Sequence, residues 1–289
     1  MTGGLTTPIV LAVLLGALLH ASWNALIKSA ADKALDTALI HALGGFVGLA
    51  LLLAWGGPRA AAWPYIAASI VVHVAYYATL AAAYQHGDLG LTYPVMRGSA
   101  PLLVALAGSL VLGERIAWIA WLGVLAISLG VLALGFAGRH APGGSHRKAL
   151  GFALTNAALI AVYTVIDGLG VRAAGDAVAY VAALFMLDAV PYFTMVMARR
   201  APAQRSEAWA YMRRRWPVAG LGTLASLTSY GIALWAMTRA PVALVAALRE
   251  TSVLFAVLIG ALCFGERLGA PKVLGVSIIV AGVWLLRLG

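Results

Sequence analysis

Long apolar segments recur along the whole chain, and short polar loops separate them. Each segment runs for about 20 residues, the length that a helix needs to cross the hydrocarbon layer of a membrane. The pattern predicts an all-α polytopic membrane protein with ten transmembrane helices. The predicted spans are residues 8–28, 36–55, 62–86, 90–112, 117–137, 149–170, 177–198, 216–238, 241–263 and 270–288.

Most of the predicted loops are short, so successive helices should be antiparallel neighbours. Two polar stretches are longer and basic, residues 138–148 and 199–215. We predict both as loops on the side of the membrane opposite to the termini. The first one divides the chain into two halves of five spans each, residues 1–137 and 149–289.

One stretch of sequence occurs twice. Residues 97–115 read RGSAPLLVALAGSLVLGER, and residues 249–267 read RETSVLFAVLIGALCFGER. The alignment places Arg97 on Arg249 and continues through the glycines of the following span, which indicates an internal duplication. Because five is odd, the second copy enters the membrane from the opposite side. The halves are therefore predicted to be inverted repeats, an architecture typical of secondary transporters whose substrate site lies at the repeat interface.

Composition supports a membrane protein and excludes several other classes. Hydrophobic residues make up 63% of the chain and charged residues 10%, whereas soluble domains carry about 25% charged residues. The net charge of +10 belongs to loops beside apolar segments, as topology signals do, so we expect no nucleic-acid partner. The single cysteine, Cys263, excludes a disulfide framework and a cysteine metal site. We expect no metal and no cofactor.

The ten spans, the two halves and a helix that ends in Gly-Glu-Arg in each half resemble the drug/metabolite transporter superfamily, EamA type. The resemblance covers nearly the whole chain. It implies two EamA-like repeats, a central cavity lined by several helices and export of a small metabolite. Members handle amino acids, nucleotide-linked compounds, sugars and cations. The small multidrug exporters, which are distant relatives, use a Glu in their first helix, but the first span here contains no acid.

Polar residues inside the spans are the candidate site residues, because such groups are costly in lipid and usually face protein or water. On the first span they form a stripe with helical spacing, and the sixth span carries an equivalent stripe. Deep aromatic and histidine residues on the third and eighth spans extend this surface. Hydrogen bonding between helices is an alternative role for each of them. These candidates are His20, Trp23, Asn24, His73, Tyr77, Asn156, Tyr163 and Tyr230.

Two arginines lie deep in the repeated segments, and a buried guanidinium requires an anion. Arg97 has no acid in its own helix. For Arg249 the expected partner is Asp167, Asp188 or the substrate, since the adjacent Glu250 points about 100° away around the helix. Both arginines are candidates for a carboxylate or phosphate clamp, with a structural ion pair as the alternative.

The remaining polar residues of the spans are expected to have structural roles. His41, Asp188 and Tyr192 are interpreted as packing or hydrogen-bonding residues. Glu114 and Glu266 follow helix-ending glycines and are interpreted as boundary and capping residues.

These observations predict a secondary transporter that exports a small organic metabolite, such as an amino acid, by alternating access. Proton coupling is an option, with Asp167 and Glu250 as the candidate carriers, since desolvation raises the pKa of a carboxylate. His20 and His73 are the alternative carriers. No enzyme motif occurs in the sequence, so no catalytic residue is assigned. The alternatives are an organic-cation or drug exporter, a lipid-carrier flippase and, more remotely, an intramembrane enzyme.

We expect a monomer in a lipid bilayer, the inner membrane of a bacterium. Two orientations in the membrane are possible from the sequence. The Lys and Arg residues of 138–148 and 199–215 place both termini outside by the positive-inside rule. Members of the family are usually drawn with both termini in the cytoplasm.

Overall fold

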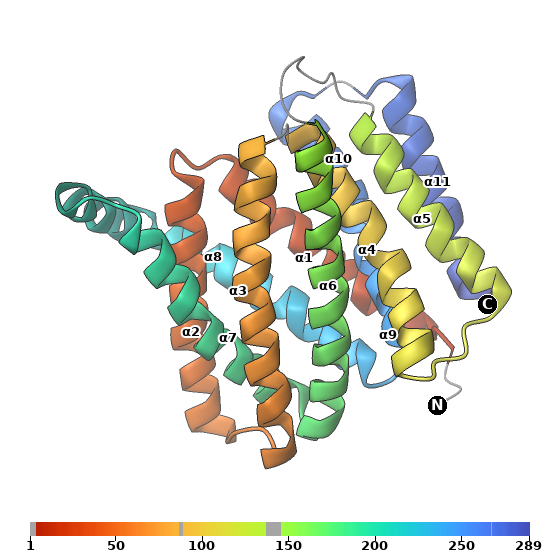
Figure 1. Ribbon diagram of the computed structural model, residues 1–289, viewed down its shortest axis with the longest axis horizontal. Helices are drawn as coiled ribbons and strands as arrows, with labels where there is room; N and C mark the ends of the chain where they lie inside the picture. Colours follow the sequence, from red (N-terminus) through yellow and green to blue (C-terminus); the bar gives the residue numbers. More distant parts are fainter. Residues whose placement is uncertain (1–3, 87–88, 137–145, 267) are drawn as a thin grey trace.

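The computed structural model describes residues 4–86, 89–136, 146–266 and 268–289 as a bundle of helices (Figure 1). Ten segments of these ranges are long and apolar enough to cross a membrane, which confirms the predicted all-α, ten-span fold. Most of the predicted loop 138–148 lies outside the described residues. The elements are α1 (Thr7–Lys28), α2 (Lys33–Trp55), the 3₁₀ turn η1 (Ala60–Ala62), α3 (Trp63–His86), α4 (Leu89–Val111), α5 (Trp118–Phe136), α6 (His146–Ala174), α7 (Ala177–Ala198), α8 (Pro202–Met237), α9 (Val242–Arg249), α10 (Ser252–Phe264) and α11 (Ala270–Leu288).

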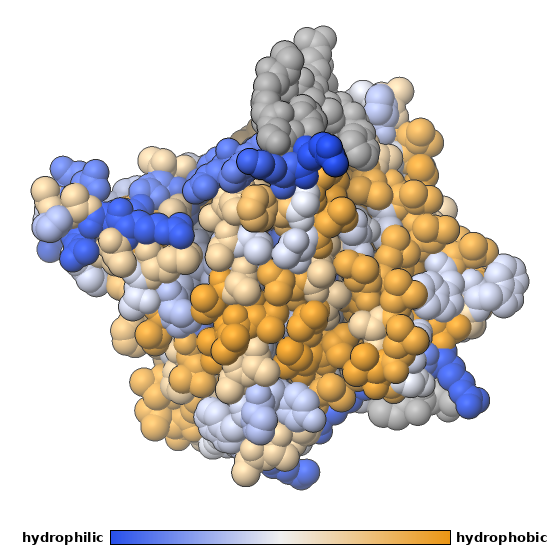
Figure 2. All heavy atoms as spheres, viewed as in Figure 1, coloured by the Kyte–Doolittle hydropathy of each residue, from blue (hydrophilic) through white to orange (hydrophobic). Residues whose placement is uncertain are grey.

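The outside of the bundle is apolar over most of its height. Figure 2 shows a hydrophobic surface between two more hydrophilic ends, and large aliphatic side chains such as Leu53, Leu110 and Leu262 are largely exposed on the helices. A water-soluble protein would bury such side chains. The chain is therefore an integral membrane protein, and this belt faces lipid.

The basic stretch 199–215 is helical, so its prediction as a loop is wrong. Helix α8 begins at Pro202 rather than at residue 216, and its first turns project beyond the bundle in Figure 1. Proline suits the first turn of a helix, and the Gln204 side chain accepts a hydrogen bond from the Ala201 amide. The apolar pattern detects only the part of a helix that lies in lipid, so it cannot find a polar extension.

Two ion pairs hold this extension against α2. Arg215 donates to Asp36 at 2.6 Å, and the Tyr211 hydroxyl donates to the same carboxylate at 2.8 Å. Arg200 donates to Asp32 at 2.7 Å. Partial burial alone would raise the pKa of Asp32, but hydrogen bonds from the Leu35 amide and from Arg200 outweigh it and hold the pKa below its usual value.

The ninth predicted span is divided into α9 and α10, so its prediction as one continuous helix is also wrong. The amides of Glu250 and Thr251 donate to the carbonyls of Ala247 and Leu248, three residues back, each at 3.1 Å. This bonding is tighter than an α-helix and often marks a hinge inside a longer helix. The equivalent place in α4, around Arg97, is continuous helix.

Helices α5 and α11 pack backbone against backbone through glycines, and both come from equivalent places in the two halves. A Cβ built on Gly123 would lie 2.9 Å from the carbonyl oxygen of Gly282, and a Cβ on Gly282 would lie 2.9 Å from that of Gly123. Gly130 and Gly275 approach each other in the same way, at 2.9 and 3.1 Å. Only glycine permits so close a crossing, as in other membrane helix pairs.

We therefore expect Gly123→Val to separate α5 from α11 and to destabilise the protein by about 1–3 kcal/mol, the usual cost of overpacking. The matched control is Gly220→Ala in α8, where a Cβ would meet no atom within 4 Å. That change should be neutral or stabilising by up to about 1 kcal/mol. Thermal unfolding in detergent micelles measures both, and an equal loss of melting temperature in the two variants would contradict this packing.

Candidate functional site

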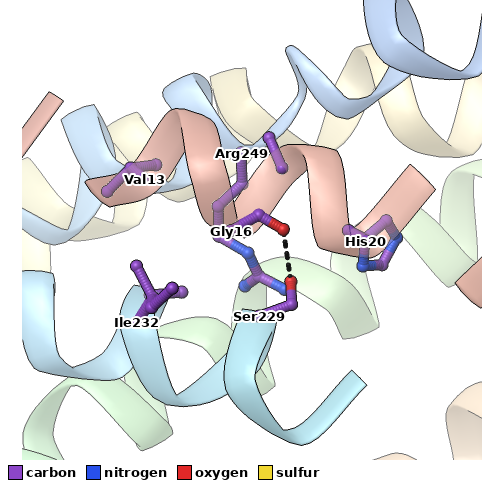
Figure 3. A pocket seen from close by; sticks show the side chains of 8 residues that line it. Val13, Gly16, His20, Ser229, Ile232 and Arg249 are labelled. Atoms are coloured by element: carbon purple, nitrogen blue, oxygen red, sulfur yellow. Dashed lines mark hydrogen bonds between the residues drawn. The ribbon is translucent and has the colours of Figure 1, made fainter. Parts of the chain in front are cut away.

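Two narrow pockets meet at Arg249 in the middle of the bundle. The first lies between α1 and α8 and is lined by Gly16, His20, Ser229 and Arg249 (Figure 3). In Figure 3 the Arg249 side chain extends from α9 into the gap between these helices. The Ser229 hydroxyl donates to the Gly16 carbonyl at 2.7 Å, which joins α1 to α8 beside the guanidinium.

The second pocket lies on the other side of Arg249, between α4, α6 and α9. Arg97, Tyr163 and Glu250 line it together with Arg249. Its cavity volume is about 10 Å³, which is room for about one water molecule. Side chains therefore fill both of these pockets almost completely in this conformation.

Arg97 and Glu250 form an ion pair across the two repeats, with Nε and Oε2 3.0 Å apart. Both side chains are nearly buried, and the contact lacks the angle of a hydrogen bond, so the attraction is electrostatic. The sequence interpretation set Glu250 aside as a partner of Arg249 and named no acid for Arg97. The acid comes from the opposite repeat, where Glu250 occupies the end of α9 and α9 packs against α4.

Arg249 has a different environment. No carboxylate of the described residues lies within 4 Å of its guanidinium, and none of them is hydrogen-bonded to it. Its guanidinium carbon lies 5.1 Å from the centre of the Tyr230 ring, a cation–π contact. The protein partners expected for it, Asp167 and Asp188, are both bonded to other groups.

Asp167 is fully buried on α6 and accepts hydrogen bonds from two tyrosines. The Tyr180 hydroxyl donates to one oxygen at 2.8 Å, and the Tyr230 hydroxyl donates to the other. Tyr230 thus contacts both Asp167 and Arg249. The carboxylate and the guanidinium lie on the same side of the site with an aromatic ring between them.

The other predicted site residues lie behind these pockets or bond within their own helix. His73 stacks on Tyr163 with ring centres 4.4 Å apart. Asn156 donates to the Tyr76 carbonyl and to Thr79, so it joins α6 to α3. Trp23 and Asn24 make their hydrogen bonds to His20, one to its ring and one to its carbonyl.

The structure also assembles a cluster that the sequence interpretation missed. The Tyr77 hydroxyl donates to Asp188 Oδ2 at 2.7 Å, and His41 Nδ1 lies 3.4 Å from the same oxygen. The His41 ring stacks on Tyr192 with centres 4.7 Å apart. The four residues come from α2, α3 and α7. Only Asp188 and Tyr192 are linked by a helical spacing, one turn apart on α7. No group of three His, Cys, Asp or Glu side chains suited to a metal ion occurs in the described part of the chain.

Glu114 and Glu266 end equivalent helices with the same local geometry. Each follows a glycine with positive φ, Gly113 at +64° and Gly265 at +65°, and each amide donates 3.1 Å to the glycine carbonyl six residues back. A glycine in the left-handed region ends many helices, in agreement with the predicted role of both glutamates at a helix boundary.

The two carboxylates nevertheless face different partners. Glu114 is nearly buried, accepts hydrogen bonds from the Val242 and Ala243 amides at the start of α9, and pairs with Arg172 at 3.2 Å. Glu266 is exposed and pairs with Lys28 and Lys272. Hydrogen bonds from these two lysines hold the pKa of the Glu266 carboxyl below its usual value.

Comparisons with known proteins agree with this architecture. A family model described as "EamA-like transporter family" matches residues 7–136 and 147–288. A solved chain described only as "Crystal structure of protein" matches with a TM-score of 0.74 and 20% identity, over 98% of this chain and 96% of that one. At this identity the likeness shows the fold. No curated protein matches the sequence.

The Arg97–Glu250 ion pair leads to a prediction about stability. Glu250→Gln should leave the Arg97 cation buried without its counter-charge and destabilise the protein by about 3–5 kcal/mol. The double variant Arg97→Gln with Glu250→Gln should recover part of that loss, because it leaves no unpaired charge. Thermal unfolding measures the cycle, with Glu207→Gln on the exposed start of α8 as the control. If the loss in the double variant equals the sum of the losses in Arg97→Gln and Glu250→Gln alone, the two groups do not interact.

Proposed function

Because the chain belongs to the EamA-like transporter family, we propose that it exports a small organic metabolite by alternating access, as a monomer in the inner membrane of a bacterium. Each matched segment of the family model corresponds to one five-helix half, which supports a proposal of two inverted repeats that move against each other. The substrate would bind at the centre, where both repeats contribute charged residues.

The observation that carries the substrate proposal is the unpaired guanidinium of Arg249. A buried cation is costly without an anion, and among the described residues Arg249 has none. A guanidinium presents two parallel donors that match a carboxylate. The substrate would therefore bring a carboxylate, and Arg249 would bind it.

Groups around Arg249 suit the rest of an amino acid. Glu250 lines the second pocket, and Asp167 is bonded to Tyr230, which contacts Arg249, so either acid would attract an amine. The rings of Tyr163 and Tyr230 offer a wall for an apolar or flat side group. An organic cation fits less well, because it would bring a further positive charge beside the unpaired guanidinium of Arg249.

The difference between Glu114 and Glu266 supports alternating access. At one end of the bundle, Glu114 fastens the end of α4 to the start of α9. At the other end, the equivalent Glu266 faces two exposed lysines. In the opposite conformation we expect the roles to exchange, so that Glu266 contacts the start of α4. The junction between α9 and α10 would act as a hinge, with Pro101 in α4 at a matching depth.

Removing the charge of Glu114 should loosen the end that it closes. We expect Glu114→Gln to raise the labelling rate of a cysteine at Ala246, which lines the second pocket, several-fold. The reagent is a membrane-impermeant maleimide, used on protein in which Cys263 has been replaced by Ser. Glu266→Gln is the matched control and should not raise this rate. Equal rates in the two variants would argue against a gate at Glu114.

The substrate proposal is tested with an amino acid and its decarboxylated amine. Purified protein in liposomes should exchange L-phenylalanine faster than phenethylamine. Arg249→Gln should reduce that preference about 10- to 100-fold, the effect of losing a hydrogen bond to a charged group. Arg239→Gln, an exposed arginine over Trp235, is the control and should keep the preference. An amine preferred by the wild type and unaffected by Arg249→Gln would reject the carboxylate site.

A further inference from the structure

Four carboxylates are buried inside the described spans, and their partners differ. Asp36 pairs with Arg215, and Glu250 pairs with Arg97. Asp167 accepts hydrogen bonds from two tyrosines. Asp188 faces a histidine, His41. The partner decides whether a carboxylate can take part in proton exchange at physiological pH.

Arginine remains charged at every physiological pH, so a carboxylate paired with it stays ionised. Tyrosine hydroxyls donate hydrogen bonds and give up their protons only in strong alkali. Histidine is the side chain whose charge changes between pH 5 and 8. Of the four buried carboxylates, Asp188 is the one that has a histidine within 4 Å.

The geometry of this pair suits proton binding. Asp188 Oδ2 receives the Tyr77 hydroxyl and lies within 3.4 Å of His41 Nδ1, while Oδ1 is buried and has no hydrogen-bond partner among the described residues. His41 and Asp188 keep 21% and 11% of their side-chain surface exposed, so neither side chain is fully enclosed by protein. Protonated, the pair is neutral overall; deprotonated, it leaves one negative charge among apolar helices.

We propose that His41 and Asp188 form the proton-binding site of the transporter. This rests on the proposed function. The imidazole takes one proton from water on one side of the membrane and returns it to water on the other, and the net charge of the pair changes between zero and −1. Neither substrate nor protein forms or breaks another bond.

Contacts on α3 connect this pair to the central pockets. Tyr77 bonds to Asp188, and its ring lies 6.3 Å from the ring of His73 in a stacked orientation. His73 stacks in turn on Tyr163, which lines the second pocket. A change of charge at Asp188 therefore acts on side chains that reach the substrate site.

Other titratable and charged groups surround the pair and belong to the same electrostatic environment. His73 and Tyr77 on α3 lie beside Asp188, and Tyr192 on α7 stacks on His41. Asp32, Arg199 and Arg200 lie beyond Tyr192. Where α8 packs against α2, Asp36 and Arg215 pair with each other.

The experiment separates exchange from proton-driven accumulation. Protein in liposomes is offered a mixture of radiolabelled L-amino acids, first as counterflow without a pH gradient and then with a gradient. The wild type should do both. His41→Gln and Asp188→Asn should retain measurable counterflow but lose the accumulation that the gradient drives. His86→Gln, at the end of α3 away from the cluster, should behave as the wild type.

Tyr77→Phe provides a second test that keeps the aromatic ring and both titrating groups. It removes one hydrogen bond to the carboxylate, so the pH at which accumulation is half-maximal should shift. An unchanged midpoint would overturn the proposal, as would wild-type accumulation by His41→Gln or Asp188→Asn. Wild-type counterflow with no response to a pH gradient would overturn it and leave the transporter function standing. Failure of counterflow in the wild type would overturn both.

Discussion

Charge balance in a low-dielectric environment controls the centre of this protein. An ionised group inside a membrane must be paired or hydrated, and the site contains two arginines against one glutamate. Arg97 takes the glutamate, and Arg249 is left with the face of a tyrosine. Asp167 lies behind that tyrosine with both oxygens already bonded. Under the proposed function, the guanidinium of Arg249 would bind the carboxylate of the substrate.

The duplicated sequence explains where this imbalance comes from. The two repeats place an arginine at equivalent positions, 97 and 249, but the next residue is glycine in one copy and glutamate in the other. One repeat thus supplies the acid that the other copy's arginine requires. At the same point the second copy departs from regular α-helix, whereas the first continues through it. Because the copies differ at this position, Arg97 has a carboxylate partner and Arg249 has none among the described residues.

The sequence predicted the elements far better than the contacts between them. Apolar length located the spans, and the two Gly-Glu-Arg endings were found to close equivalent helices. The polar start of α8 was missed because its charged residues resemble a loop when only hydropathy is considered. The partner of Arg97 was missed because Glu250 lies over 150 positions away and beside another arginine. His41, Tyr77 and Asp188 meet only when three helices pack, so no local pattern could join them.

The glycine contact between α5 and α11 has a consequence of its own. Gly123 meets Gly282 and Gly130 meets Gly275, and the repeat places Gly123 on Gly275 and Gly130 on Gly282. The first glycine of each helix therefore meets the second glycine of the other helix, so the two surfaces contact each other through equivalent positions. That reciprocity is the mark of an isologous interface between identical subunits. A single five-helix copy would carry both sides of this contact, so two copies could meet through it as the two halves of the chain do.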